Sequence, residues 1–159
     1  MRMRCQTAAR HRRVSWVPPL QPAEPWAALL ERIGGIENEE HIILLGPDGP
    51  DLMCILLRTG APNVTHLRSC ERLEAGSASM IVVPPTGAVD WLEKALPAVR
   101  HALIPNGRLV VAVDPVPSLE DRVGRWLKLQ AFAAVRIVRV AGLWVLTAEV
   151  PAYGFRLTA

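Results

Sequence analysis

Long hydrophobic runs are missing from the sequence, and so are the spacings of cysteine and histidine that hold metals. No apolar stretch approaches the roughly 20 residues that a membrane-spanning helix needs, so we expect a soluble protein with no membrane partner. The three cysteines lie far apart and form no CxxC pair, which predicts reduced thiols in a cytoplasmic protein and no metal. A Walker loop, a G-x-S-x-G elbow and an H-E-x-x-H helix are also absent. No familiar catalytic motif is therefore present.

Acidic residues are absent from the first thirteen positions, which carry five arginines. The chain has 18 Lys and Arg against 15 Asp and Glu, so removing these five leaves 13 basic and 15 acidic side chains. A near-neutral body argues against a nucleic-acid surface over the whole domain. We expect residues 1–24 to be an arm without fixed structure, because four prolines lie within residues 14–25. An over-extended start, a targeting leader and an electrostatic contact with nucleic acid are the alternatives.

Residues 25–159 are predicted to form one α/β domain with its core at residues 41–150. Apolar residues at helical spacing predict a short amphipathic helix over residues 25–33. Two β-rich runs near the end are separated only by Ala141-Gly142, a connection that can join antiparallel strands but cannot cross over between parallel ones. Strands are expected at 41–46, 63–67, 79–85, 108–115, 134–140 and 143–150, and helices at 51–59, at 89–103 and after a capping box formed by Ser118 and Asp121.

This alternation predicts a three-layer Rossmann-like sheet that is mostly parallel and ends in an antiparallel hairpin. The stretch ALPAVRHALIPNGRLVVAVDP resembles the helix, Pro-x-Gly turn and strand of the class I S-adenosylmethionine-dependent methyltransferases, with Pro105-Asn106-Gly107 as the turn. Trp144 in the hairpin and HIILLGPDGPDL, in the place of the glycine-rich cofactor loop, add to the resemblance. The resemblance covers about 110 residues, and it implies S-adenosyl-L-methionine as the cofactor.

The positions that should bind this cofactor are occupied by other residue types. Leu44 stands where the family has an acidic residue, and Gly46 alone keeps the register of its Gly-x-Gly-x-Gly loop. Asp48 is a candidate substitute for the lost carboxylate, and Gly49 could form a tight turn together with Gly46. The alternative is a simple βα turn with no role in binding. The family has a second acidic residue, which accepts hydrogen bonds from the ribose hydroxyls. His66, Leu67 and Arg68 occupy the equivalent positions here, and an arginine cannot accept those bonds because it has donors only.

Two further loops follow the resemblance less closely. About ten residues, RSCERLEAGS, are too few for the family's usual helix and third strand, so the sheet is expected to be truncated there. Val83-Pro84-Pro85-Thr86 resembles the Asn/Asp-Pro-Pro-aromatic loop of amino-group methyltransferases, without its amide and its aromatic ring. Asp114 is the remaining carboxylate expected at the ligand crevice, or it caps the turn before Pro115. The candidate binding residues are Gly46, Asp48, Gly49, Arg68, Pro84, Thr86 and Asp114, and no catalytic residue is identified.

Three functions are consistent with this pattern. The first is a methyltransferase-like pseudoenzyme, weakly active or inactive, which binds an unidentified protein partner or associates with itself as a scaffold. The second is a divergent, active S-adenosylmethionine-dependent methyltransferase for an unknown acceptor, since methyl transfer depends largely on positioning. The third is an NADP-binding or nucleotide-binding module in which Arg68 contacts a phosphate.

Overall fold

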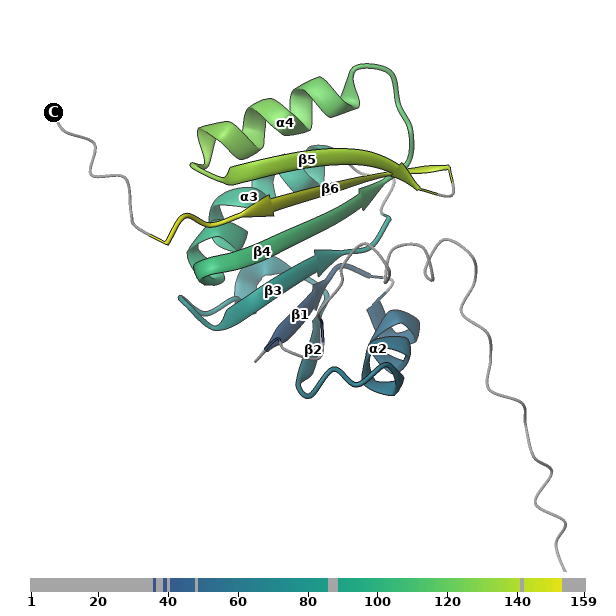
Figure 1. The fold of residues 1–159 in the computed structure, drawn as a ribbon, viewed down its shortest axis with the longest axis vertical. Helices are drawn as coiled ribbons and strands as arrows, with labels where there is room; N and C mark the ends of the chain where they lie inside the picture. Colours follow the sequence, from purple (N-terminus) through teal and green to yellow (C-terminus); the bar gives the residue numbers. More distant parts are fainter. Residues whose placement is uncertain are drawn as a thin grey trace, which may run out of the picture.

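The computed structural model describes residues 36, 39, 41–47, 49–85, 89–140 and 142–152. The helix expected over residues 25–33 and the arm over residues 1–24 lie outside this range. Strands and helices alternate as predicted (Figure 1). They are β1 (Ile42–Leu45), α2 (Gly49–Arg58), β2 (Val64–Leu67), the 3-10 helix η2 (Cys70–Arg72), β3 (Ala78–Val83), α3 (Val89–Ala102), β4 (Leu103–Val113), α4 (Leu119–Leu129), β5 (Ala133–Val140) and β6 (Leu143–Glu149).

These six strands form one sheet in the order β2-β1-β3-β4-β6-β5. Strand β1 runs parallel to β2 and β3, and β3 runs parallel to β4. Strand β6 is antiparallel to both β4 and β5, which confirms the predicted terminal hairpin. Strand β2 lies at one edge because residues 68–77 form only η2 and loops. The predicted truncation of the sheet is therefore confirmed.

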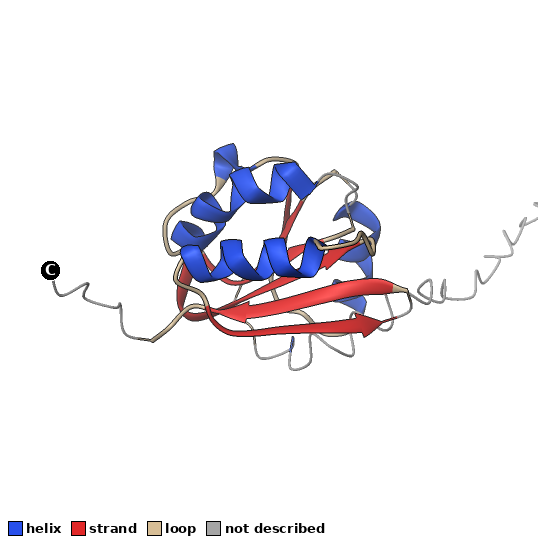
Figure 2. Cartoon of the chain, turned by 90° about the horizontal axis from the view of Figure 1, so that it is seen from above, coloured by secondary structure: helices blue, strands red, loops and turns tan. Residues whose placement is uncertain are grey.

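The sheet is covered on both faces by apolar side chains, as expected for the three layers. Helices α3 and α4 lie on the same side of the sheet (Figure 2), where Leu96, Val99, Val123 and Leu127 are fully buried in one core cluster. Helix α2 contributes Leu52 and Leu56 to a second cluster on the opposite face, together with residues of β1, β3, β4 and β6. All four residues of β1 are buried, because this strand has neighbours on both edges and cover on both faces. None of the described helices is long and apolar enough to cross a bilayer.

The start of α4 differs from the predicted capping box. Ser118 lies in the left-handed region, with φ 65° and ψ 5°, and its side chain makes no capping hydrogen bond. A capping hydroxyl normally needs extended backbone at that position to reach the exposed N–H groups of the first turn. Here the backbone alone closes the turn: the Leu119 N–H donates to the Val116 carbonyl at 3.1 Å. The predicted role of Ser118 and Asp121 is wrong, although the helix itself is present.

The segment Pro105-Asn106-Gly107 is not a turn that precedes a strand. Strand β4 already begins at Leu103 and continues through these residues. The Asn106 N–H donates to the Val150 carbonyl at 2.9 Å, and the Val150 N–H donates to the Gly107 carbonyl at 2.8 Å. Asn106 has φ 62°, a conformation that asparagine tolerates better than most residues. The predicted turn is therefore an irregularity inside a longer strand, held by the end of the hairpin.

His41 connects three strands at the amino end of the sheet. Its Nδ1 lies 2.6 Å from the Ser77 carbonyl and its Nε2 lies 2.8 Å from Thr65 Oγ1. Since a carbonyl can only accept, Nδ1 is the donor to Ser77, and Thr65 Oγ1 is the hydrogen-bond partner of Nε2. The His41 N–H donates to Ser79 Oγ at 3.1 Å, and that hydroxyl donates back to the His41 carbonyl at 2.9 Å. The sequence alone identifies only a histidine at a strand start.

Replacing His41 by alanine should lower the free energy of unfolding by about 1–3 kcal/mol, because Thr65 and Ser77 then lose partners at partly buried positions. Urea denaturation followed by circular dichroism measures the change. The matched control is His101→Ala, whose side chain is exposed near the end of α3; it should change the free energy by less than about 0.5 kcal/mol. Equal effects of the two substitutions would contradict the account of His41.

Candidate functional site

The parallel strands β2, β1, β3 and β4 all end at the same edge of the sheet. In open α/β sheets, ligands bind outside the carboxyl ends of the strands, where successive connections leave on opposite sides. That point is β1 here, because the chain passes first to β2 on one side and then to β3 on the other (Figure 1). The candidate site is therefore the region around the turn that follows β1.

The structure places the predicted binding residues around this edge as follows. Gly46 and Gly49 are buried in the turn after β1, and Pro84 is buried after β3. Arg68, directly after β2, and Asp114, directly after β4, are exposed. Asp48 and Thr86 lie outside the described residues. A role of these seven residues in ligand binding stays a prediction.

The His66 side chain connects the end of β2 to the turn after β1. Its Nε2 lies 2.7 Å from the Gly46 carbonyl oxygen, which only accepts, so Nε2 is the donor. The Gly46 N–H donates to the Leu67 carbonyl at 2.9 Å. A Cβ added at Gly49 would lie 2.0 Å from His66 Cδ2 and 2.4 Å from His66 Nε2. The imidazole thus fills the side of Gly49 on which other residues have a side chain.

Both glycines of the turn are therefore explained by the chain's own geometry. Gly46 has φ 134°, a conformation that glycine adopts without penalty. Gly49 lacks the Cβ that would overlap the His66 ring. The strand ends beside the turn are apolar: Leu44 is 0% exposed and Val83 is 1% exposed. In the sequence, residues 66–68 align with the family's acidic position, and Arg68 is the candidate binding residue among them. The contact of His66 with both glycines depends on the pairing of β1 with β2, which the sequence does not show.

Substituting Gly49→Ala should lower the free energy of unfolding by about 1–3 kcal/mol, because the new methyl group overlaps the His66 ring. In a His66→Ala background the space is open, and the same substitution should have almost no cost. Urea denaturation of the four proteins gives the coupling between the two sites. Additive effects would show that the ring and the glycine do not share this space.

A hollow of about 400 Å³ lies beyond the end of β2, next to the turn. The guanidinium groups of Arg68 and Arg72 offer donors there, and the Glu71 carboxylate, which sequence reasoning missed, offers an acceptor. Burial raises the pKa of the neighbouring Cys70 thiol, and the Glu71 charge raises it further, so this thiol is a poor nucleophile near neutral pH. The hollow is lined by His66, Leu67, Arg68, Ser69, Glu71 and Arg72.

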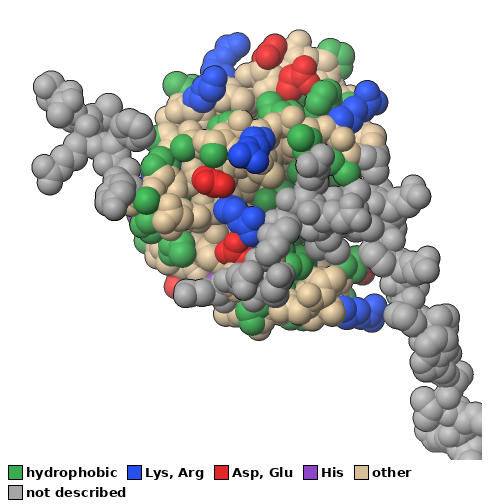
Figure 3. All heavy atoms as spheres, in the orientation of Figure 1, with side chains coloured by type: hydrophobic (Ala, Val, Ile, Leu, Met, Phe, Trp, Pro, Cys, Tyr) green, Lys and Arg blue, Asp and Glu red, His purple; other side chains and the backbone are tan. Residues whose placement is uncertain are grey.

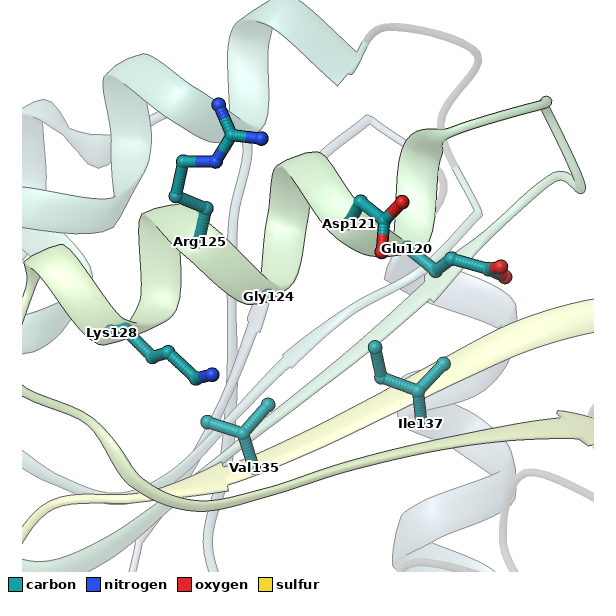
Figure 4. Close-up of a pocket in the computed structure, with 7 residues that line it drawn as sticks. All are labelled: Glu120, Asp121, Gly124, Arg125, Lys128, Val135 and Ile137. Atoms are coloured by element: carbon teal, nitrogen blue, oxygen red, sulfur yellow. The ribbon is translucent and has the colours of Figure 1, made fainter.

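A second hollow, of about 480 Å³, lies between α4 and β5 (Figure 4). Strand β5 is four strands away from β1 in the sheet, so this hollow is separate from the candidate site. Charged side chains of α4 surround it, and Val135 and Ile137 of β5 form its floor. Within the described ranges, no three His, Cys, Asp or Glu side chains are grouped so that they could hold a metal ion.

Comparison with known proteins identifies the class of fold. No family model matches the sequence, and no curated protein matches it either. Human N-acetylserotonin methyltransferase, solved in complex with S-adenosylmethionine, aligns with a TM-score of 0.63 at 11% identity, covering 79% of this chain and 51% of that one. This chain thus spans about half of the human enzyme.

Two bacterial structures align similarly. The 1,6-didemethyltoxoflavin-N1-methyltransferase of Burkholderia thailandensis, solved with S-adenosylhomocysteine, gives a TM-score of 0.60 at 15% identity, covering 80% of this chain and 76% of that one. A methyltransferase from Aquifex aeolicus gives 0.59 at 17% identity, covering 79% and 89%. The protein therefore has a class I methyltransferase-like Rossmann fold, truncated at the edge beside β2.

Proposed function

We propose that this protein has a methyltransferase fold but is inactive or only weakly active, and that it works as a binding or scaffold partner. The main observation is the position of the His66 ring, which bonds to Gly46 and fills the open side of Gly49. In a cofactor-binding turn, glycine leaves that kind of space so that the ligand can approach the backbone. Here protein atoms occupy it.

The surrounding residues support the same proposal. Leu44 and Val83 place buried apolar groups at strand ends where the related enzymes need polar ones. Arg68 has no acceptor for ribose hydroxyls, and the Asp114 carboxylate is exposed rather than enclosed. Methyl transfer depends on holding the donor and the acceptor in line. A His66 ring beside Gly49 would weaken the hold of the turn on the donor, and with it the main source of catalysis.

Calorimetric titration of the full chain with S-adenosylmethionine and S-adenosylhomocysteine tests the proposal. We expect a dissociation constant weaker than about 1 mM for both, equivalent to less than about 4 kcal/mol of binding free energy. The matched variant is His66→Ala, which removes the ring without introducing a charge. If this variant binds and the wild type does not, the ring closes the site. Micromolar binding by the wild type would refute the proposal.

A second function is favoured by the hollow beyond β2, whose two guanidinium groups and one carboxylate suit a charged, hydroxyl-bearing ligand. This second function is the binding of a nucleotide or NADP. In a divergent, active methyltransferase the ligand of the hollow would instead be the methyl donor. Two of the similar structures contain S-adenosylmethionine or S-adenosylhomocysteine, which supports the methyl donor as one such ligand.

Thermal unfolding with a panel of nucleotides, NADP and the methyl donor tests this second function. A ligand present at 100 times its dissociation constant should stabilise the fold by about 2.7 kcal/mol. Substituting Arg68→Ala should remove that shift if the hollow is the site, whereas Arg58→Ala, an exposed residue at the end of α2, should not. A panel in which no compound raises the melting temperature would exclude the second function.

A further inference from the structure

The hollow between α4 and β5 is an open groove at one edge of the molecule. Strand β5 is the last strand of the sheet, with β6 as its neighbour among the described residues. Val135 and Ile137 on the groove floor are half-buried, so part of their apolar surface is still exposed to water. The groove is lined by Glu120, Asp121, Gly124, Arg125 and Lys128 of α4 and by Val135 and Ile137 of β5 (Figure 4).

The charges along this groove are separated by sign. Glu120 and Asp121 lie in the first turn of α4, whereas Arg125 and Lys128 lie in its second half. In the close-up the acidic pair is at one end, the basic pair at the other, and Gly124 between them (Figure 4). The space-filling view shows acidic and basic side chains grouped separately over α4, at the top of the molecule (Figure 3). In the part of the chain that the structure describes, the salt bridges are Arg108–Glu39 and Arg122–Asp90, and neither includes any of these four residues.

The other charged side of α4 is already engaged within the chain. Arg122 lies 3.5 Å from the Asp90 carboxylate of α3 and 5.0 Å from the centre of the Trp126 ring. At the end of the helix, the Leu129 side chain is 74% exposed, the highest value among the large hydrophobic residues that the structure describes. The groove side of α4 and its carboxyl end thus combine unpaired charges with exposed apolar surface, a combination typical of interfaces.

We propose that this groove binds the α4 helix of a second copy of the chain, in a symmetric dimer whose two-fold axis passes beside Gly124. In antiparallel helices related by such an axis, Lys128, four residues after Gly124, faces Glu120 of the other copy, four residues before it. Symmetry repeats the pair at the other end. Arg125 and Asp121 of the two copies come within one turn of each other.

Gly124 is suited to the position nearest the axis. A Cβ added there would meet only Ile137 Cδ1, at 3.9 Å, so the chain's own atoms leave this space open. The absence of a side chain lets two helix backbones approach closely and lets the partner cover Val135 and Ile137. A partner of uniform charge would be repelled at one end of the groove, whereas a reversed copy of α4 matches both ends. The dimer goes beyond the proposed function and does not depend on the loss of cofactor binding.

Light scattering and sedimentation of the full chain test the dimer. At about 50 µM and low salt we expect twice the 17.4 kDa mass of the chain, with dissociation at high salt because the paired charges are screened. The variants E120K/D121K and R125E/K128E each give α4 a groove side of one sign, so each alone should associate at least about 10-fold more weakly. Mixed in equal amounts they should form a heterodimer, because every end then meets the opposite charge.

The matched control is R58E/K94E, which changes the net charge as R125E/K128E does but at exposed positions on α2 and α3; its dimer should be unchanged. Circular dichroism confirms that each variant is folded. A wild-type chain that stays monomeric at about 200 µM would overturn the proposal. So would a dimer that neither groove variant weakens, or a mixture of two folded variants that fails to associate.

Discussion

The hydrogen bond from His66 to the Gly46 carbonyl, together with the fit of its ring against Gly49, holds the turn around which the candidate site is built. It fixes the end of β2 against the turn after β1, and Gly49 is also the first residue of α2. Helix α2 then covers β1 and the neighbouring strands with Leu52 and Leu56. The same ring lies beside the turn in which, under the proposed function, it takes the place of the cofactor.

A fold of this class can lose its ligand site without losing its core. The two apolar clusters lie on the faces of the sheet, whereas the candidate site is formed by loops at the strand ends. Leu44 and Val83, at the positions where the resemblance to the methyltransferases implies polar groups, are fully buried and therefore add to the core. Polar groups at a site generally reduce stability, so their replacement by apolar residues favours the folded state. A fold of this class can therefore be kept while the residues of its site change.

Much of the fold follows from the sequence, for physical reasons that differ between elements. Continuous apolar runs identify β1 and β3 because both are buried on two faces, and Ala141-Gly142 is too short for anything but a hairpin. The prediction of a capping box at Ser118 was wrong because the left-handed backbone of this residue depends on the loop before it. The contact between His66 and Gly49 was missed because it joins residues brought together by strand pairing. A pattern within one element can be recognised from spacing, whereas a contact between two elements needs their register.

The most direct measurement of the central claim is an amide NMR titration of the full chain with S-adenosylhomocysteine. The account predicts that the Gly46 and Gly49 resonances keep their positions up to about 1 mM ligand, because the His66 ring occupies the space beside them. Saturable shifts of both glycine resonances at micromolar ligand would contradict it. They would show that the ligand binds at the turn, either with the His66 ring in place or after the ring has moved.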